Sequence, residues 1–312
     1  MAASSSKKVI YAALIGNFLI AITKFGASAV TGSSAMLSEA IHSVVDTGNQ
    51  GLLLHGMRRA RRPPDPSHPF GYGMELYFWT FVVAIMVFAV GAGLSIYEGI
   101  DRLRYPHPVS DPMINYIVLG CAMVFEGIAW TIAFREFRKQ QGPHGFLRAV
   151  RRSKDPTIFT VLFEDTAAML GLVVAFVGIA LGQYYGNSHY DAAASLLIGC
   201  ILAITAILLA IESKALLIGE SASRETVAEL SEIAAGTPGI IAVNETLTMH
   251  FGPQDVLLNL SVDFDDALGS PEVEAAISAL EARIKNAFPE IKRVFVEAQS
   301  VIGHTKDRET ER

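Results

Sequence analysis

Six long stretches in the first two thirds of the chain are dominated by hydrophobic positions. They are residues 9–29, 35–55, 75–96, 113–134, 157–181 and 192–211. Each is about 20 residues long or longer, which is the length that an α-helix needs to cross the hydrocarbon core of a bilayer. The pattern therefore predicts an α-helical membrane protein whose six transmembrane helices lie within residues 1–216.

Beyond residue 217 the hydrophobic positions form shorter runs with helical or alternating periodicity. In the order helix, strand, strand, helix, strand, these runs are residues 223–239, 240–252, 255–265, 270–288 and 291–299. This α-β-β-α-β order predicts a small sheet with helices on one face over residues 217–303. The polar residues 304–312 are expected to form a disordered tail.

Composition supports this division of the chain. Hydrophobic residues make up 51% of the 312 residues and charged residues only 18%, below the roughly 25% of soluble domains. With a net charge of -6, the chain lacks the basic excess that is typical of nucleic-acid-binding proteins. Cys121 and Cys200 both lie in apolar runs, where packing is a better interpretation than a disulfide.

Basic residues indicate how the predicted helices are oriented. One side of the membrane carries Lys7, Lys8, Arg58, Arg59, Arg61, Arg62, Arg135, Arg138, Lys139, Arg148, Arg151, Arg152 and Lys154. The other side carries only Arg102 and Arg104. The positive-inside rule then predicts that both termini are cytoplasmic. The first apolar stretch lacks a clear cleavage site, so it is expected to be a transmembrane helix and not a signal peptide.

The second hydrophobic stretch contains a polar stripe. Glu39, His42 and Asp46 are spaced three and then four residues apart, so they share one helix face, and Asn49 and Gln50 continue it. A charged side chain at the centre of a membrane costs at least ~2.5 kcal/mol, so a stripe of this kind needs a compensating role. A histidine and an aspartate one turn apart can hold a divalent metal ion. A buried polar network that joins helices is the alternative.

The fifth stretch carries two adjacent acids, Glu164 and Asp165. Neighbouring residues on a helix point about 100° apart, so only one of the two can face the polar stripe directly. Four other polar residues, Asn17, Lys24, Glu126 and Glu212, are expected to pair with one another or to extend toward the interface.

Several motifs together resemble the cation diffusion facilitator family of divalent-metal transporters. They are "HSVVD" with its preceding "SSAMLSEAIHS", and "HPFGYGMEL" before the third stretch. The resemblance implies a homodimer in a lipid membrane that exports Zn(II) or a similar ion in exchange for protons. It also implies a metallochaperone-like cytoplasmic domain, no enzymatic activity, and a metal that is substrate and not cofactor.

The resemblance assigns the transport-site ligands residue by residue. His42 and Asp46 match the family's two ligand positions in the second helix, and Asp165 matches the second position in the fifth. The first position there is Val161, which cannot bind metal. The fourth ligand is left open among Glu164, Glu39, Asn49 and water. An oxygen-rich set of this kind makes Mn(II), Fe(II) and Co(II) alternative substrates.

Two further family sites are altered in this sequence. In the loop before the third helix, Asp65 and His68 match but Tyr72 replaces a frequent histidine, so either a weak metal site or a polar turn is expected. In the cytoplasmic domain the ligand positions carry Asn244, Leu260, Glu297 and Gln299. Because no histidine is among them, we expect that the zinc cluster has been lost. Nearby His250 is interpreted as a strand residue.

Other functions and locations remain as alternatives. A metal sensor or scaffold, a membrane-embedded metallohydrolase and a channel each fit part of the pattern. The expected location is a bacterial inner membrane, with an organelle membrane as the alternative. Asp191, just before the sixth stretch, is expected to cap that helix and not to bind metal.

Overall fold

The computed structural model describes residues 2–140 and 155–310. The chain divides into two compact units. Met1–Arg59 with Glu75–Lys214 is called the helical unit, and Ala60–Met74 with Ala215–Arg312 is called the soluble unit. Residues 60–74, which the sequence places between two membrane helices, therefore fold with the C-terminal part of the chain. Arg148, Arg151, Arg152 and Lys154, which contributed to the predicted orientation, lie outside the described residues, as do the side chains of Lys7, Lys8 and Lys139.

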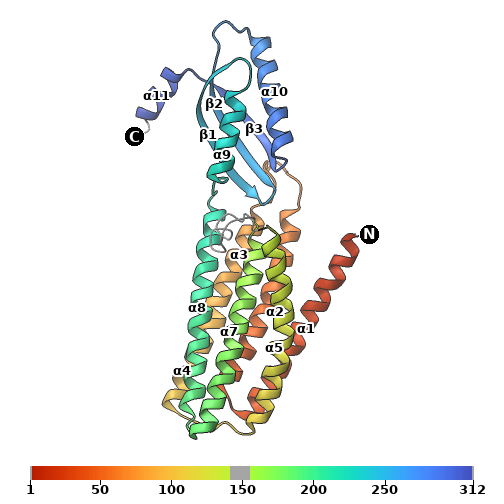
Figure 1. Ribbon diagram of the computed structural model, residues 1–312, viewed down its shortest axis with the longest axis vertical. Helices are drawn as coiled ribbons and strands as arrows, with labels where there is room; N and C mark the ends of the chain where they lie inside the picture. The colour runs from red at the N-terminus through yellow and green to blue at the C-terminus, as the bar shows by residue number, and fades with distance from the viewer. Residues whose placement is uncertain (1, 141–154, 311–312) are drawn as a thin grey trace. The chain divides into compact units, whose positions relative to one another are not determined.

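The helical unit contains long helices that run side by side (Figure 1). They are α1 (Ala2–Thr31), α2 (Ser34–Ala60), α3 (Glu75–Met86), η1 (Val87–Ala92), α4 (Gly93–Arg104), α5 (Pro112–Gln140), α7 (Pro156–Tyr185) and α8 (His189–Leu217). α3, η1 and α4 are successive parts of one rod, in which η1 is a π-helical segment. The six predicted rods are thus present.

Four of these rods are long and apolar enough to cross a membrane, judged on the described residues. They are Glu75–Arg104, Pro112–Arg135, Phe159–Tyr185 and His189–Leu217. The apolar part of α1 that is described, Asn17–Thr31, is shorter, and α2 carries the polar stripe. The protein is therefore an integral membrane protein by its apolar helices, and the count of six spans stays a prediction.

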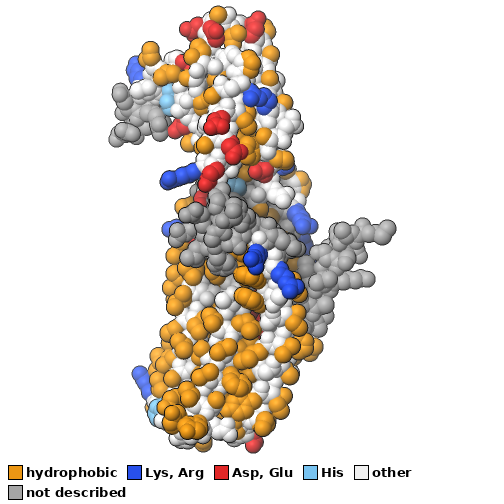
Figure 2. Space-filling view, viewed as in Figure 1, with side chains coloured by type: hydrophobic (Ala, Val, Ile, Leu, Met, Phe, Trp, Pro, Cys, Tyr) orange, Lys and Arg blue, Asp and Glu red, His pale blue; other side chains and the backbone are white. Residues whose placement is uncertain are grey.

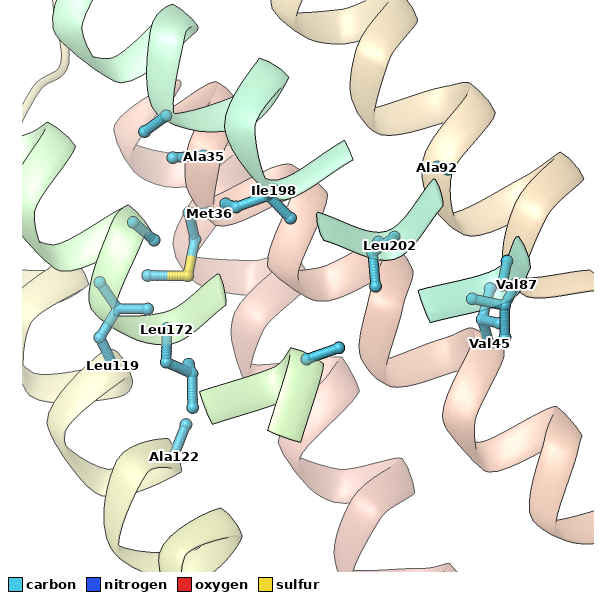
Figure 3. Packing of buried hydrophobic residues seen from close by; sticks show 14 of the residues in the cluster. Ala35, Met36, Val45, Val87, Ala92, Leu119, Ala122, Leu172, Ile198 and Leu202 are labelled. Carbon is cyan, nitrogen blue, oxygen red and sulfur yellow. The ribbon is translucent and has the colours of Figure 1, made fainter. Parts of the chain in front are cut away.

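Hydrophobic side chains lie both inside and outside the helical unit. Between the helices, Met36, Leu119, Leu172 and Ile198 are fully or almost fully buried (Figure 3). Apolar side chains also cover much of the visible outer face of this unit (Figure 2). A surface of this kind suits hydrocarbon as the surrounding solvent.

Glycines allow two of the helices to approach closely. A Cβ atom on Gly99 of α4 would lie 2.7 Å from Leu196 Cγ of α8, and one on Gly199 of α8 would lie 2.6 Å from Ile96 Cγ1 of α4. Small residues at a helix crossing are the usual means by which membrane helices pack tightly. This crossing therefore fixes α8 against the rod formed by α3, η1 and α4.

The soluble unit confirms the predicted α-β-β-α-β order. Its elements are α9 (Arg224–Ala235), β1 (Ile240–Gly252), β2 (Asp255–Phe264), α10 (Ser270–Ala287), β3 (Ile291–Ala298) and α11 (Val301–Thr310). β2 lies between β1, to which it is antiparallel, and β3, to which it is parallel. Alternate residues of β2, such as Leu258 and Leu260, pack in the core with Leu230 of α9 and Leu280 of α10.

The C-terminal segment differs from the sequence prediction. α11 occupies residues 301–310, where residues 304–312 were expected to be a disordered tail. Ser300 begins the helix, because its hydroxyl accepts from Gly303 N at 3.2 Å and its carbonyl accepts from His304 N at 3.0 Å. The carboxylate of Asp263 accepts from Val301 N at 3.1 Å. A serine cap and a tertiary contact therefore order a polar segment that has no hydrophobic periodicity.

Residues 60–74 are held on the soluble unit by aromatic and polar contacts. Phe70 stacks on Phe251 of β1 with ring centroids 5.0 Å apart. Arg293 of β3 donates to the carbonyl of Phe70 at 3.1 Å and to Asp255 Oδ1 at 2.9 Å. The backbone of Gly73 passes so close to β1 that a Cβ atom would lie 2.2 Å from Phe251 O. The loop after α2 is thus a structural part of the soluble unit.

Candidate functional site

The polar stripe of α2 is buried inside the helical unit. Glu39 and His42 are 0% and 1% exposed. His42 Nε2 and Asp46 Oδ2 are 3.4 Å apart. Neither ring nitrogen of His42 has a hydrogen-bond partner among the described residues, and the same holds for Asp46 Oδ1. Buried polar atoms usually have hydrogen-bond partners, so a group of neighbouring polar atoms without them is unusual.

The two acids of α7 lie beside this stripe. Asn49 of α2 donates to Glu164 Oε1 at 2.7 Å, and both side chains are buried. Of the two adjacent acids, Glu164 is therefore the one that contacts the stripe directly. Asp46 interacts electrostatically, as a like charge, with both Glu164 and Asp165. This contact agrees with the prediction that only one of the two adjacent acids faces the stripe directly.

Two contacts fix α2 against α7, one on each side of His42 and Asp46. At one end Asn49 meets Glu164. At the other end Glu39 Oε1 lies so near α7 that a Cβ atom on Gly171 would be 2.2 Å from it. Later residues of α7 face earlier residues of α2, so the two helices run antiparallel. His42 and Asp46 consequently lie against the part of α7 that follows Glu164.

α1 contributes a lysine to the same region. Lys24 is fully buried, and its ammonium is 3.0 Å from Glu39 Oε2 and 2.8 Å from Ser43 Oγ. The sequence suggested that Lys24 pairs with another intramembrane residue but did not identify Glu39. Glu126 of α5 is also buried and interacts electrostatically with Lys24 and with Asp165. Charged residues of three helices, α1, α5 and α7, therefore lie around the stripe of α2.

The candidate ligands are not closed around a common point in this conformation. Within residues 2–140 and 155–310, no three His, Cys, Asp or Glu side chains are close enough together to hold a metal ion. His42 and Asp46 form one half of the candidate site, and Glu164 and Asp165 form the other. The assignment of these residues as metal ligands stays a prediction.

The loop residues Asp65 and His68 form a tight turn. Asp65 Oδ1 accepts from the backbone N–H groups of Ser67 at 2.9 Å and His68 at 2.8 Å, and Oδ2 accepts from Tyr72 Oη at 2.6 Å. The Tyr72 hydroxyl, followed by the His68 N–H, lowers the pKa of the Asp65 carboxyl below its ordinary value. Both oxygens are thus engaged in the turn, which favours the polar-turn interpretation over a weak metal site.

The altered ligand positions of the soluble unit serve its own packing. Asn244 Nδ2 donates to Gln299 O at 2.7 Å, and Leu260 is buried in the hydrophobic core. His250 lies on β1 as predicted, with Nδ1 3.3 Å from Gly252 O. His304 of α11 lies with Nδ1 3.1 Å from Gln299 Oε1.

Asp191 acts on a different helix from the one expected. It lies in the first turn of α8, but its Oδ2 accepts from Ser34 N at 2.6 Å and from Ser34 Oγ at 2.9 Å. Its Oδ1 accepts from Ser33 Oγ at 2.5 Å. The carboxylate therefore caps the N-terminus of α2, where a negative charge is favourable. The prediction that Asp191 caps its own helix is therefore wrong, and the helix that it serves could not be read from local sequence.

Comparison with known proteins identifies the family. The cation efflux transmembrane domain matches residues 10–218. The mitochondrial proton-coupled zinc antiporter SLC30A9 of Homo sapiens is 36% identical over 260 residues, which cover 83% of this chain and 46% of that protein. Metal tolerance protein C4 of Arabidopsis thaliana is 28% identical over 262 residues, covering 83% of this chain and 57% of that protein. The chain thus spans about half the length of these two relatives. The manganese efflux system protein MneP of Bacillus subtilis is 24% identical over 307 residues, covering 96% and 95% of the two chains. This chain belongs to the cation efflux family of transporters, the cation diffusion facilitators.

Proposed function

We propose that this protein exports divalent transition-metal cations from the cytoplasm in exchange for protons, with Zn(II) as the first candidate. The observation that carries the proposal is the set of buried donor atoms on His42 and Asp46 that lack hydrogen-bond partners among the described residues. The human relative is named a proton-coupled zinc antiporter and the Bacillus relative a manganese efflux protein. These names agree with a divalent cation as the substrate.

The ligand set that we propose combines one imidazole with carboxylates from two helices. His42 and Asp46 supply one side, and Asp165 and Glu164 supply the other. Imidazole nitrogen and carboxylate oxygen both bind zinc at about 2 Å. Glu164 is bound to Asn49, so it has to exchange that contact for the metal, whereas no hydrogen bond to a described residue holds Asp165.

Proton exchange follows from the chemistry of these donors. A metal ion binds the neutral imidazole and the ionised carboxylates, so metal and protons compete for the same atoms. We infer that protonation of these ligands on the far side of the membrane releases the metal, and that their deprotonation on the cytoplasmic side permits loading.

The test is transport by the full chain in proteoliposomes. His42→Ala and Asp46→Ala should each reduce zinc-driven proton flux to the level of empty vesicles. His55→Ala is the matched control, because His55 lies on the same helix but contacts Trp79, with ring centroids 4.7 Å apart. Its flux should stay within about twofold of wild type. Undiminished flux in either site variant would refute the assignment, and competition among Zn(II), Mn(II), Fe(II), Co(II) and Cd(II) would identify the substrate.

We also propose a homodimer with both termini on the cytoplasmic side. Exposed apolar residues of the sheet support a second copy as partner, because Leu247 and Phe295 flank Asn259 in register on adjacent strands. Light scattering of the purified protein should give twice the mass of one chain. Labelling of single cysteines at the two termini in oriented vesicles should occur from the cytoplasmic side. Several relatives are mitochondrial, so an organelle membrane stays an alternative to a bacterial one.

A further inference from the structure

Lys24 and Glu39 form an ion pair in the most enclosed part of the helical unit. Both side chains are 0% exposed, and the Nζ–Oε2 distance is 3.0 Å. Ser43, one turn further along α2, gives Lys24 a second acceptor at 2.8 Å. An ammonium group and a carboxylate are both costly to bury, and either one alone would be strongly unfavourable. The Lys24–Glu39 pair is therefore part of the buried packing of the helices and not an incidental surface contact.

Glu39 of α2 and the two acids of α7 lie at different levels along the axis of α7. Its free oxygen, Oε1, faces Gly171, whereas the next α2 contact with an α7 acid is Asn49 with Glu164. Gly171 lies six residues beyond Asp165, which corresponds to about 9 Å along a helix. Glu39 thus lies at a different level from the acids of α7, although it shares a helix face with His42.

We propose that Lys24 is a specificity-determining residue that keeps Glu39 out of the metal site. This inference rests on the proposed function. By holding Oε2 in an ion pair, Lys24 leaves the imidazole of His42 and the acids near Asp46 as the donors that an entering ion meets. Without the ammonium, Glu39 would become one more carboxylate on the face of His42. A site richer in oxygen favours harder ions such as Mn(II) over Zn(II).

The ion pair also limits the net negative charge that the cation meets. Lys24 interacts electrostatically with Glu39, Asp46 and Glu126. Its fixed positive charge opposes that of an entering dication, so binding is weaker than the number of acids suggests. A transporter needs such weak binding, because an ion that is held too tightly is not released. Loss of the charge should consequently lower both KM and kcat.

The first experiment replaces both partners at once, which avoids a buried unpaired charge. Zinc uptake by the full chain in proteoliposomes is measured for Lys24→Met/Glu39→Gln. If Glu39 is held outside the site, the zinc KM should stay within about threefold of wild type. A rise of tenfold or more would show that Glu39 is a ligand and would overturn the proposal. The paired replacement keeps the test available even where a single replacement does not fold.

The second experiment removes only the lysine. In Lys24→Met the ratio of kcat/KM for Mn(II) to that for Zn(II) should rise at least fivefold, and the zinc kcat should fall. Adding Glu39→Gln should return the ratio to the wild-type value. Lys24→Arg, which keeps the positive charge, should retain the wild-type ratio. An unchanged ratio in folded Lys24→Met, or a raised ratio that Glu39→Gln does not correct, would overturn the proposal.

A control separates this inference from the proposed function. His42→Ala is assayed in the same vesicles. If it transports zinc like wild type, the proposed function itself fails. If it is inactive while Lys24→Met keeps the wild-type ion preference, the proposed function stands and only the role assigned to Lys24 fails.

Discussion

The cap that Asp191 places on α2 leads to a quantitative prediction for Asp191→Asn. The wild-type carboxylate is 4% exposed and accepts two hydrogen bonds from Ser34 on Oδ2 and one from Ser33 on Oδ1. The asparagine amide keeps one oxygen and has an NH₂ group in place of the other, so in either orientation at least one of these three donors loses its acceptor, and none of the bonds is any longer made to a charged group.

The expected loss of stability is about 2–4 kcal/mol. Each hydrogen bond to a charged group contributes about 1.5–3 kcal/mol, and at least one of the three is lost. The negative charge at the N-terminus of α2 contributes a further ~0.3–1 kcal/mol, because it complements the helix dipole. The site is buried, so solvent screening does not reduce these contributions much.

The measurement is the free energy of unfolding in mixed micelles, titrated with a denaturing detergent. Asp101→Asn is the matched control, because the Asp101 side chain makes no hydrogen bond to any residue in the described part of the chain; it should change stability by less than about 0.5 kcal/mol. If Asp191→Asn is as stable as this control, the cap does not hold α2 in place. Zinc transport should fall in Asp191→Asn as well, because α2 carries His42.

Three further changes test other contacts. Gly171→Ala would place a Cβ atom 2.2 Å from a buried carboxylate oxygen, so we expect a loss of about 1–3 kcal/mol by detergent titration, whereas Gly120→Ala, with nothing within 4 Å, should be neutral or stabilising. Arg293→Ala removes two hydrogen bonds, one to the loop after α2, and amide exchange in that loop should rise at least tenfold; unchanged exchange would show that the loop docks without it. Tyr72→Phe removes the contact that most lowers the Asp65 pKa, so the carboxyl should titrate at higher pH in carbon-detected NMR of the full chain. The Asp65 carboxylate stabilises the turn fully above its unfolded pKa, and this stabilisation is lost as pH falls through the lowered pKa of the folded state. Tyr72→Phe should therefore lose the ordered turn at a higher pH than wild type.

Much of the architecture was predictable because it depends on local patterns. Apolar stretches of membrane length gave the six rods, and alternation from Val256 to Phe264 gave the central strand β2. The three-and-four spacing of Glu39, His42 and Asp46 placed them on one face of α2, which is where they lie. In each case a periodicity of a few residues determines the result, so no knowledge of distant partners is needed.

The features that could not be predicted are the ones that depend on distant partners. Lys24 is 15 residues from Glu39, and Asp191 is 157 residues from Ser34. Residues 60–74 carry no periodic pattern, and their place in the soluble unit comes from a stacked aromatic pair and an arginine of β3. A lone lysine in an apolar helix signalled that some partner was needed, but only the packing of α1 on α2 decided which acid it meets.

The polar groups of α2 also discriminate between a site for an ion and a network that only joins helices. Most of them have partners on other helices, namely Ser34 with Asp191, Ser38 with Ser195, Glu39 and Ser43 with Lys24, and Asn49 with Glu164. In the middle of this series His42 Nε2 and Asp46 Oδ2 lie 3.4 Å apart, and neither side chain makes a hydrogen bond to another helix within the described residues. An unsatisfied buried polar atom costs about 1–3 kcal/mol, so three of them oppose folding by several kcal/mol. A network that only stabilised the fold would be expected to satisfy these atoms, as it satisfies the side chains of Ser34, Ser38, Ser43 and Asn49. A cation that visits the site offsets the cost each time it binds. It follows that zinc should raise the unfolding midpoint of wild type and not that of His42→Ala, even in a detergent micelle where no transport occurs.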